Sequence, residues 1–218
     1  LDGYGPRYTS YPTADRFHDG FTERDYRHWL QQRQISHSSF YPVIRGRLTQ
    51  INGQPVAQEE GDAGRTGVNR ELSMTWLAQA PTHNQLVAGQ WWHPEERGLV
   101  SVEQGVAERL GIEVGDTLQF SIEGRLISAR VGSLRRVNWQ EMQPNFFMIF
   151  SHDLLRDFPA SWLVSLRLPA SQSRLEVELV RQYPALTLID TDSIMQRLQE
   201  VLEQISRALG LMFSLVAL

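Results

Sequence analysis

The stretch SVEQGVAERLGIEVGDTLQFSIEGRLISARVGSLRRV, residues 101–137, contains the densest set of local structural signals in the chain. Ser101, followed three residues later by Gln104, forms a capping box at the start of a helix. The helix is expected to run to Leu110, and Gly111 follows at the position where a left-handed residue commonly ends a helix. This half of the stretch therefore predicts one short, well-delimited helix.

The second half of the same stretch predicts strands joined by tight turns. Gly115-Asp116 forms a turn, and Glu123-Gly124 forms another before the returning run RLISARVGSL. Between the turns, every second residue is apolar, as expected for a strand with one buried face: Leu118, Phe120 and Ile122. The whole stretch is predicted to form a small, curled antiparallel β unit.

The flanking sequence continues this pattern on both sides. Before the stretch, strands are predicted in YPVIRGRLTQING (41–53), ELSMTWLA (71–78) and LVAGQWWHPEERG (86–98), the last ending in a proline turn. Asn52-Gly53 suits a type I′ hairpin, because both residues accept positive φ. After it, PNFFMIF (144–150) is a strand, and residues 161–190 have the order strand, helix, strand of a β-α-β unit. The chain as a whole is predicted to be α+β, with a sheet covered by helices and a β-rich insertion.

Residues 191–218, TDSIMQRLQEVLEQISRALGLMFSLVAL, predict a long amphipathic helix. Asp192 can cap it, and apolar residues recur at spacings of three and four: Ile194, Leu198, Val201, Ile205 and Leu209. From Leu209 onward the sequence is almost entirely apolar, yet this end is far shorter than the roughly 20 residues that cross a bilayer. Two interpretations stay open from the pattern alone: a helix packed on the core, or a membrane helix cut by the chain end.

Composition narrows the functional classes. A net charge of -4 at pH 7 gives no reason to expect nucleic-acid binding, and all 21 basic residues are Arg, scattered along the sequence. The absence of Cys excludes disulfides, thiolate nucleophiles and Cys-ligated iron–sulfur clusters. The chain starts without an initiator Met or a secretory signal, so we expect it to be a fragment of a longer protein.

A few isolated polar residues are candidates for chemistry. The spacing of His83 and His93 in the sequence is too weak a signal to predict that both bind one metal ion. A proline turn explains the position of His93 beside Glu95 and Glu96 better than acid–base chemistry does. Asp190 and Asp192 are explained by helix capping. No catalytic, cofactor-binding or metal-binding residue is predicted. A hydrophobic groove near Trp76, Trp91 and Trp92 would suit a soluble β-rich binding module, although core packing is the more common role of large aromatic residues.

The first residues resemble a known enzyme. GPRYTSYPTA (5–14), with DRF and DYRHWL after it, is similar to the N-terminal segment of oxygen-independent coproporphyrinogen III oxidase, a radical S-adenosylmethionine enzyme. In that family, a C-x-x-x-C-x-x-C loop holds a [4Fe–4S] cluster, and this chain has no Cys, so it cannot carry the activity. We interpret residues 1–34 as a leader that is not part of the main fold, with a short helix after Thr22, and we expect it to make few contacts with the remainder.

Residues 35–218 resemble a different family. They are similar to the extracytoplasmic domain of YbbP-type FtsX-like permeases of ABC transporters. The matching segments, in family order, are YPVIRGRLTQINGQPV, NRELSMTW, VAGQWW, VSVEQGVAERLGIEVGDTLQF, SLRRVNWQEMQPNFFMIF and LIDTDSIMQRLQEVLEQIS. With the different leader in front, the resemblance suggests a chimera.

The permease resemblance implies a MacB-like periplasmic core domain over residues 35–208, with a β-α-β porter part and a β-rich insertion. Residues 209–218 would then begin a truncated transmembrane helix in the bacterial inner membrane. The resemblance also implies a non-enzymatic part of a transporter for lipid-like or hydrophobic compounds, facing the periplasm. Its partners would be a cytoplasmic ABC ATPase subunit and, in some members, a periplasmic lysophospholipase or thioesterase.

Overall fold

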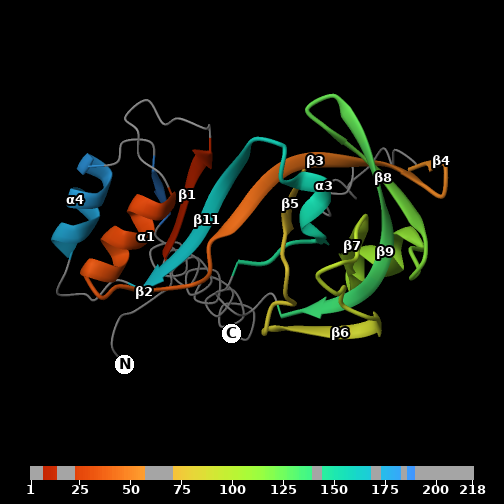
Figure 1. The fold of residues 1–218 in the computed structure, drawn as a ribbon, viewed down its shortest axis with the longest axis horizontal. Coiled ribbons are helices and arrows are strands. Elements are labelled where there is room, and N and C mark those ends of the chain that lie inside the picture. The colour runs from red at the N-terminus through yellow and green to blue at the C-terminus, as the bar shows by residue number, and fades with distance from the viewer. Residues whose placement is uncertain are drawn as a thin grey trace, which may run out of the picture.

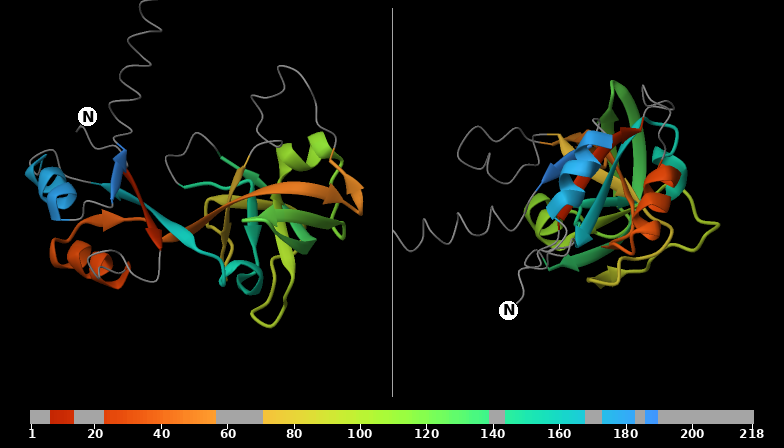
Figure 2. Two further views of the ribbon diagram at one scale, coloured as in Figure 1. Left: turned by 90° about the horizontal axis from the view of Figure 1, so that it is seen from above. Right: turned by 90° about the vertical axis from the view of Figure 1, so that its left-hand side faces the viewer.

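The computed structural model describes residues 7–13, 23–56, 71–138, 144–167, 173–182 and 186–189. They form an α+β fold made mostly of strands, which confirms the predicted class. Figures 1 and 2 show two parts side by side. We call residues 7–40 and 160–189 the helical lobe and residues 41–158 the barrel lobe. The chain passes between the lobes along two strands, β3 (Tyr41–Ile51) and β11 (Ala160–Arg167).

The helical lobe is a sheet with two helices packed against it. Its strands are β1 (Arg7–Thr13), β2 (Ser36–His37), β11 (Ala160–Arg167) and β12 (Thr187–Ile189), and its helices are α1 (Glu23–Gln32) and α4 (Ser173–Gln182). β1 lies between β11 and β12 and is antiparallel to both, so β11 and β12 run parallel. The predicted strand, helix, strand order is thus a split β-α-β unit, with β1 in the gap.

The N-terminal residues are integrated into this lobe, so the expectation that residues 1–34 stand apart with few contacts is wrong. β1 pairs with β11 along its whole length, from Arg7 opposite Leu166 to Thr13 opposite Ala160. The α1 side chains Trp29 and Leu30 are 5% and 0% exposed. The physical reason is that the parallel strands β11 and β12 are separated by the width of one strand, which β1 fills. The apolar side chains of α1 are buried because this helix packs against the same sheet.

The core of the helical lobe joins the N- and C-terminal parts of the chain. Its buried residues are Tyr26, Trp29, Leu30, Ile35, Phe40, Val164, Leu166, Leu179 and Leu186. At the surface, Arg33, which follows α1, bonds Glu178 of α4 at 2.6 Å, a contact between partly exposed groups that contributes about 1 kcal/mol or less.

The barrel lobe is built on a closed ring of strands. Its members are β3 (Tyr41–Ile51), β5 (Leu72–Trp76), β7 (Leu99–Glu103), β8 (Thr117–Ile122), β9 (Arg125–Val137) and β10 (Met148–Phe150). Pairing runs from β3 to β5, β10, β7, β9 and β8, and β8 pairs again with β3. β4 (Gln54–Pro55) pairs with the end of β3, and β6 (Asn84–Gly89) adds to β9 outside the ring. Ring closure removes the free edges that an open sheet would present.

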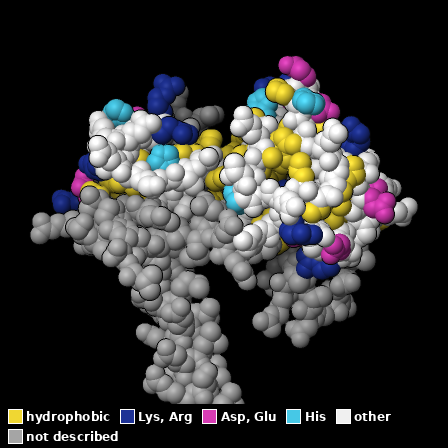
Figure 3. Space-filling model, turned by 90° about the horizontal axis from the view of Figure 1, so that it is seen from below, with side chains coloured by type: hydrophobic (Ala, Val, Ile, Leu, Met, Phe, Trp, Pro, Cys, Tyr) yellow, Lys and Arg dark blue, Asp and Glu magenta, His cyan; other side chains and the backbone are white. Residues whose placement is uncertain are grey.

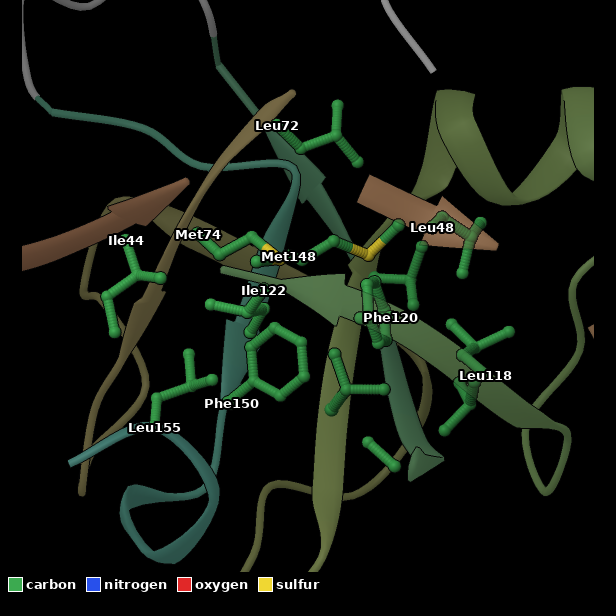
Figure 4. Packing of buried hydrophobic residues seen from close by; sticks show 14 of the residues in the cluster. Ile44, Leu48, Leu72, Met74, Leu118, Phe120, Ile122, Met148, Phe150 and Leu155 are labelled. Atoms are coloured by element: carbon green, nitrogen blue, oxygen red, sulfur yellow. The ribbon is translucent and has the colours of Figure 1, made fainter. Parts of the chain in front are cut away.

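Alternating side chains fill the interior of the ring, as Figure 4 shows. The central residues are Ile44, Leu48, Leu72, Met74, Val100, Val102, Leu118, Phe120, Ile122, Val131, Met148 and Phe150. The rings of Phe120 and Phe150 meet edge to face with centroids 5.0 Å apart. The predicted alternation of Leu118, Phe120 and Ile122 is confirmed, since all three are fully buried.

Two helices accompany the ring, α2 (Gln104–Leu110) and α3 (His152–Leu155). The predicted α2 is confirmed, with Gly111 at φ 65° as its left-handed end, but its cap is not Ser101. The carboxylate of Glu103 accepts the Val106 N–H at 2.9 Å, while Ser101 lies in β7 and its hydroxyl accepts from Ser133. The apolar run around Ser101 therefore extends a strand up to the helix. The Asn52-Gly53 turn is confirmed, with φ values of 50° and 79°.

The predicted amphipathic helix and its truncated membrane span, residues 191–218, lie outside the described residues. Within the part of the chain that the structure describes, no helix combines the length and apolarity needed to cross a membrane.

Candidate functional site at the junction of the lobes

Of the polar residues singled out in the sequence, those that the structure describes do not come together in one site. Among the described residues, His, Asp and Glu side chains form no group of three or more that could hold a metal ion. His93 and Glu96 close a turn on themselves, with the His93 N–H donating to the Glu96 carboxylate at 2.7 Å. His83 contacts Asn145 instead, at 3.1 Å. Asp190 and Asp192 lie outside the described residues.

The tryptophans do not form one groove. Trp76 packs against the interior cluster of the barrel, whereas Trp91 and Trp92 belong to a cluster on the outside of the ring. Trp91 and Trp92 stack on each other, with ring centroids 4.0 Å apart. Their indole N–H groups donate to the carbonyls of Ala78 and Leu77, at 3.2 and 3.0 Å. The pair is therefore fixed in place, and the three tryptophans belong to two separate clusters, as the more common role of large aromatic residues in core packing leads one to expect.

The outer cluster lies where the two lobes meet, and we call it the junction cluster. Its buried members are Tyr41, Trp92, Leu99, Phe146 and Ile149, and Val43, Leu77, Trp91 and Leu163 pack against it. Tyr41 and Val43 come from β3, and Leu163 comes from β11, which lies beside β3 in antiparallel register. The cluster thus collects side chains from both strands that connect the lobes. Figure 2 shows these two strands, β3 and β11, running between the lobes.

The junction cluster is apolar with a few fixed polar groups. Burial raises the pKa of Tyr41 above its ordinary value of 10.0, and a hydrogen bond with Ser39 partly opposes the shift. The ring of Phe146 packs on Tyr41 with centroids 5.7 Å apart. Full burial of each large side chain contributes about 1.5–3 kcal/mol, so the cluster can hold the two lobes at a defined angle.

One face of the barrel lobe carries exposed apolar residues. Figure 3 shows hydrophobic side chains gathered there, with charged side chains of both signs around them. On β6, which borders the barrel, Leu86 and Val87 are 39% and 38% exposed. β6 pairs with β9 on one side, and its register shifts between Leu86 and Ala88.

Sequence reasoning missed Arg135, a side chain with 0% exposure in β9. From the sequence, the arginines were interpreted only as charges scattered along the chain, and this one was not distinguished from the others. A signal was present, because Arg135 falls in a period-two run of buried residues with Val131, Ser133 and Val137. Alternation of this kind predicts burial even where the residue type argues against it.

Comparison with known proteins gives one strong match. The chain is 43% identical over 188 residues to the uncharacterized ABC transporter permease YbbP of Escherichia coli (strain K12). The match covers 86% of this chain and 22% of that permease, so the chain spans about a fifth of the relative's length. It is therefore homologous to one segment of an ABC transporter permease.

Two further comparisons, with solved structures and with family models, do not identify a family for this chain. A crystallised domain of a candidate permease protein from Porphyromonas gingivalis aligns with a TM-score of 0.39 and 10% identity, covering 86% of this chain and 90% of that one. No family model matches the chain. Neither the sequence match nor the structural match supports an origin of residues 1–34 in coproporphyrinogen oxidase.

Proposed function

We propose that this chain is a non-catalytic extracytoplasmic domain of an ABC transporter permease. The observation that carries the proposal is the 43% identity over 188 residues to a permease of this class. We further assign it to the FtsX-like type with a MacB-like periplasmic core, located in the bacterial inner membrane and facing the periplasm.

In this proposal the domain transmits movement. A separate cytoplasmic ATPase subunit hydrolyses ATP, and the residues around Asp192 to Leu209 form a lever between the membrane part and this domain. The split β-α-β unit places β12, which ends at Ile189, beside β1 in the helical lobe. A displacement of the residues after Ile189 would therefore move the sheet of the helical lobe first. The junction cluster then passes the displacement to the barrel lobe as a rigid body.

The transported compounds are proposed to be lipid-like or hydrophobic. The exposed Leu86 and Val87 on β6 are compatible with an apolar cargo or an apolar partner surface. A periplasmic lysophospholipase or thioesterase is the proposed functional partner outside the membrane.

The test uses the complete permease with its ATPase subunit in proteoliposomes. Replacement of Val201 and Ile205 by Asp removes the apolar stripe of the lever, so ATP hydrolysis should continue while movement of a fluorescent lysophospholipid stops. A matched variant, Gln199→Asp and Gln204→Asp, changes the charge equally outside that stripe and should transport normally. Equal transport per ATP in the Val201, Ile205 variant and the wild type would contradict the proposal.

The rival function is a soluble β-rich binding module without a transport role. It predicts that the isolated chain binds the same lysophospholipid and that the complete permease without residues 35–208 still transports it. The proposed function predicts the loss of transport in that deletion.

A further inference from the structure

Arg135 is the largest fully buried side chain of the described residues and is held by two contacts from different parts of the barrel lobe. Its Nη1 donates to the side-chain oxygen of Asn84 at 2.9 Å, and its Nη2 donates to the main-chain carbonyl of Phe146. Asn84 begins β6, while Phe146 leads into β10. One guanidinium group therefore ties the outer strand of the barrel to the entry of β10.

The contacts of Arg135 continue into a small polar network. The Asn84 side chain donates to the side-chain oxygen of Asn145 at 3.3 Å, and His83 contacts the same oxygen at 3.1 Å. Asn145 in turn lies within 3.4 Å of the Asn138 carbonyl. These contacts fix Asn145, the residue before Phe146, while Arg135 holds the carbonyl of Phe146 itself. The main chain at 145–146 is therefore held at several points.

Phe146 connects this network to the junction cluster. Its carbonyl accepts from Arg135, while its ring, 4% exposed, packs against Tyr41 of β3. The chain then continues from Phe146 through β10 and α3 into β11, which enters the helical lobe. The position of Phe146 therefore affects both strands that join the lobes. It affects β3 through the contact with Tyr41, and it affects β11 through the chain that continues along β10 and α3.

General stability does not explain an arginine at this position. Burial lowers the pKa of Arg135 to about 9, although the carboxylate of Glu103 opposes the shift. The Nε atom is buried without a hydrogen-bond partner. Buried charged groups can often be replaced by apolar residues without loss of stability, so our hypothesis for Arg135 is a role in fixing local geometry.

We propose that Arg135 is a positioning residue that holds Phe146 against Tyr41 and thereby fixes the angle between the barrel lobe and the helical lobe. Its importance for transport rests on the proposed function, but the geometric claim applies to the isolated chain. The two can therefore fail separately.

The experiment measures the distance between the lobes by pulsed electron resonance on spin labels. The chain has no cysteine, so Leu126→Cys in the barrel lobe and Val177→Cys in the helical lobe provide two labelling sites without further changes. Both native side chains are exposed, at 63% and 69%, which makes the labels tolerable. The otherwise unchanged chain should give a single narrow distance distribution.

Arg135→Met keeps the volume and removes both donated hydrogen bonds, so the distribution should broaden or move to a new maximum. The control is Arg136→Met on the same strand, whose exposed side chain bonds Gln104 at 3.1 Å and which should leave the distribution unchanged. A folded Arg135→Met chain with the same narrow distribution as the control would overturn the proposal.

Asn84→Ala provides a second route if Arg135→Met does not fold. It removes the acceptor for Nη1 and keeps the arginine, so the lobe distance should again spread or shift. If Asn84→Ala leaves the distribution as narrow as in the parent chain, Arg135 serves the fold alone and the positioning role is wrong.

Discussion

The ring of Tyr41 in β3 packs against the ring of Phe146 ahead of β10, with 5.7 Å between the centroids. β3 carries the chain from the helical lobe into the barrel lobe, and the chain returns through β10, α3 and β11. This contact therefore links the outgoing and returning connections, and several predictions about the junction depend on it.

Phe146→Ala should destabilise the chain by about 3–5 kcal/mol, because it leaves a cavity between the lobes. The loss should also weaken the coupling between the lobes, so that urea unfolding followed by tryptophan fluorescence and by circular dichroism no longer coincides. Leu126→Ala, at an exposed position, is the control and should change the free energy of unfolding by about 0.5 kcal/mol or less. A loss no larger than that of the control would show that the ring contact contributes little.

Tyr41 should make the stability of the chain sensitive to alkaline pH. Its pKa is raised in the folded state, so the folded chain retains the phenolic proton while the unfolded chain loses it above 10.0. The unfolded state then binds fewer protons, and the free energy of unfolding should fall as the pH rises through about 10 and beyond. Tyr41→Phe should lack this decrease when urea melts are compared between about pH 9 and pH 11. Parallel pH profiles of the two chains would refute the assignment.

Gly46 in β3 should not tolerate a side chain, because it points into the closed barrel. A Cβ there would lie 2.5 Å from the Met74 methyl carbon and 2.8 Å from Ile122 Cγ1. Gly46→Ala should therefore cost about 1–3 kcal/mol through overpacking. Gly132→Ala is the matched control, since its nearest contact is 3.7 Å from Leu99. Thermal melts that show the same change for both variants would speak against the tightly closed ring.

Trp29 should be essential for the stability of the helical lobe. Its side chain is 5% exposed in a cluster with residues of β11 and α4, so Trp29→Ala should cost about 3–5 kcal/mol. Gln31→Ala, on the exposed side of the same helix, should be nearly neutral. A thermal unfolding midpoint for Trp29→Ala equal to that of the Gln31 control would restore the view that the N-terminal residues are a detached leader.

Local signals in the sequence predicted local structure well. The Asn52-Gly53 turn, the end of α2 at Leu110 followed by Gly111, and the alternation in β8 each depend on neighbouring residues, and all are confirmed. The cap of α2 was wrong by two positions, because Ser101 matches the capping pattern equally well but is needed in β7 to pair with β10 and β9.

Long-range relationships could not be predicted in the same way. The pairing of β3 with β8 closes the barrel, yet nothing near Leu48 or Phe120 indicates which strand lies opposite. The insertion of β1 between β11 and β12 likewise joins the two ends of the described chain. Arg135 was missed because its residue type suggested exposure, whereas its place in the alternation of β9 indicated burial.

The central claim is that this chain is an extracytoplasmic domain of a membrane permease, and accessibility of a single cysteine tests it most directly. Leu126→Cys, placed in an otherwise cysteine-free full-length permease, gives one reactive group at an exposed position near the start of β9, beside the β8–β9 turn. A maleimide that cannot cross the inner membrane should label this cysteine in intact cells with a permeabilised outer membrane. Labelling that occurs only after the inner membrane is lysed would contradict the account.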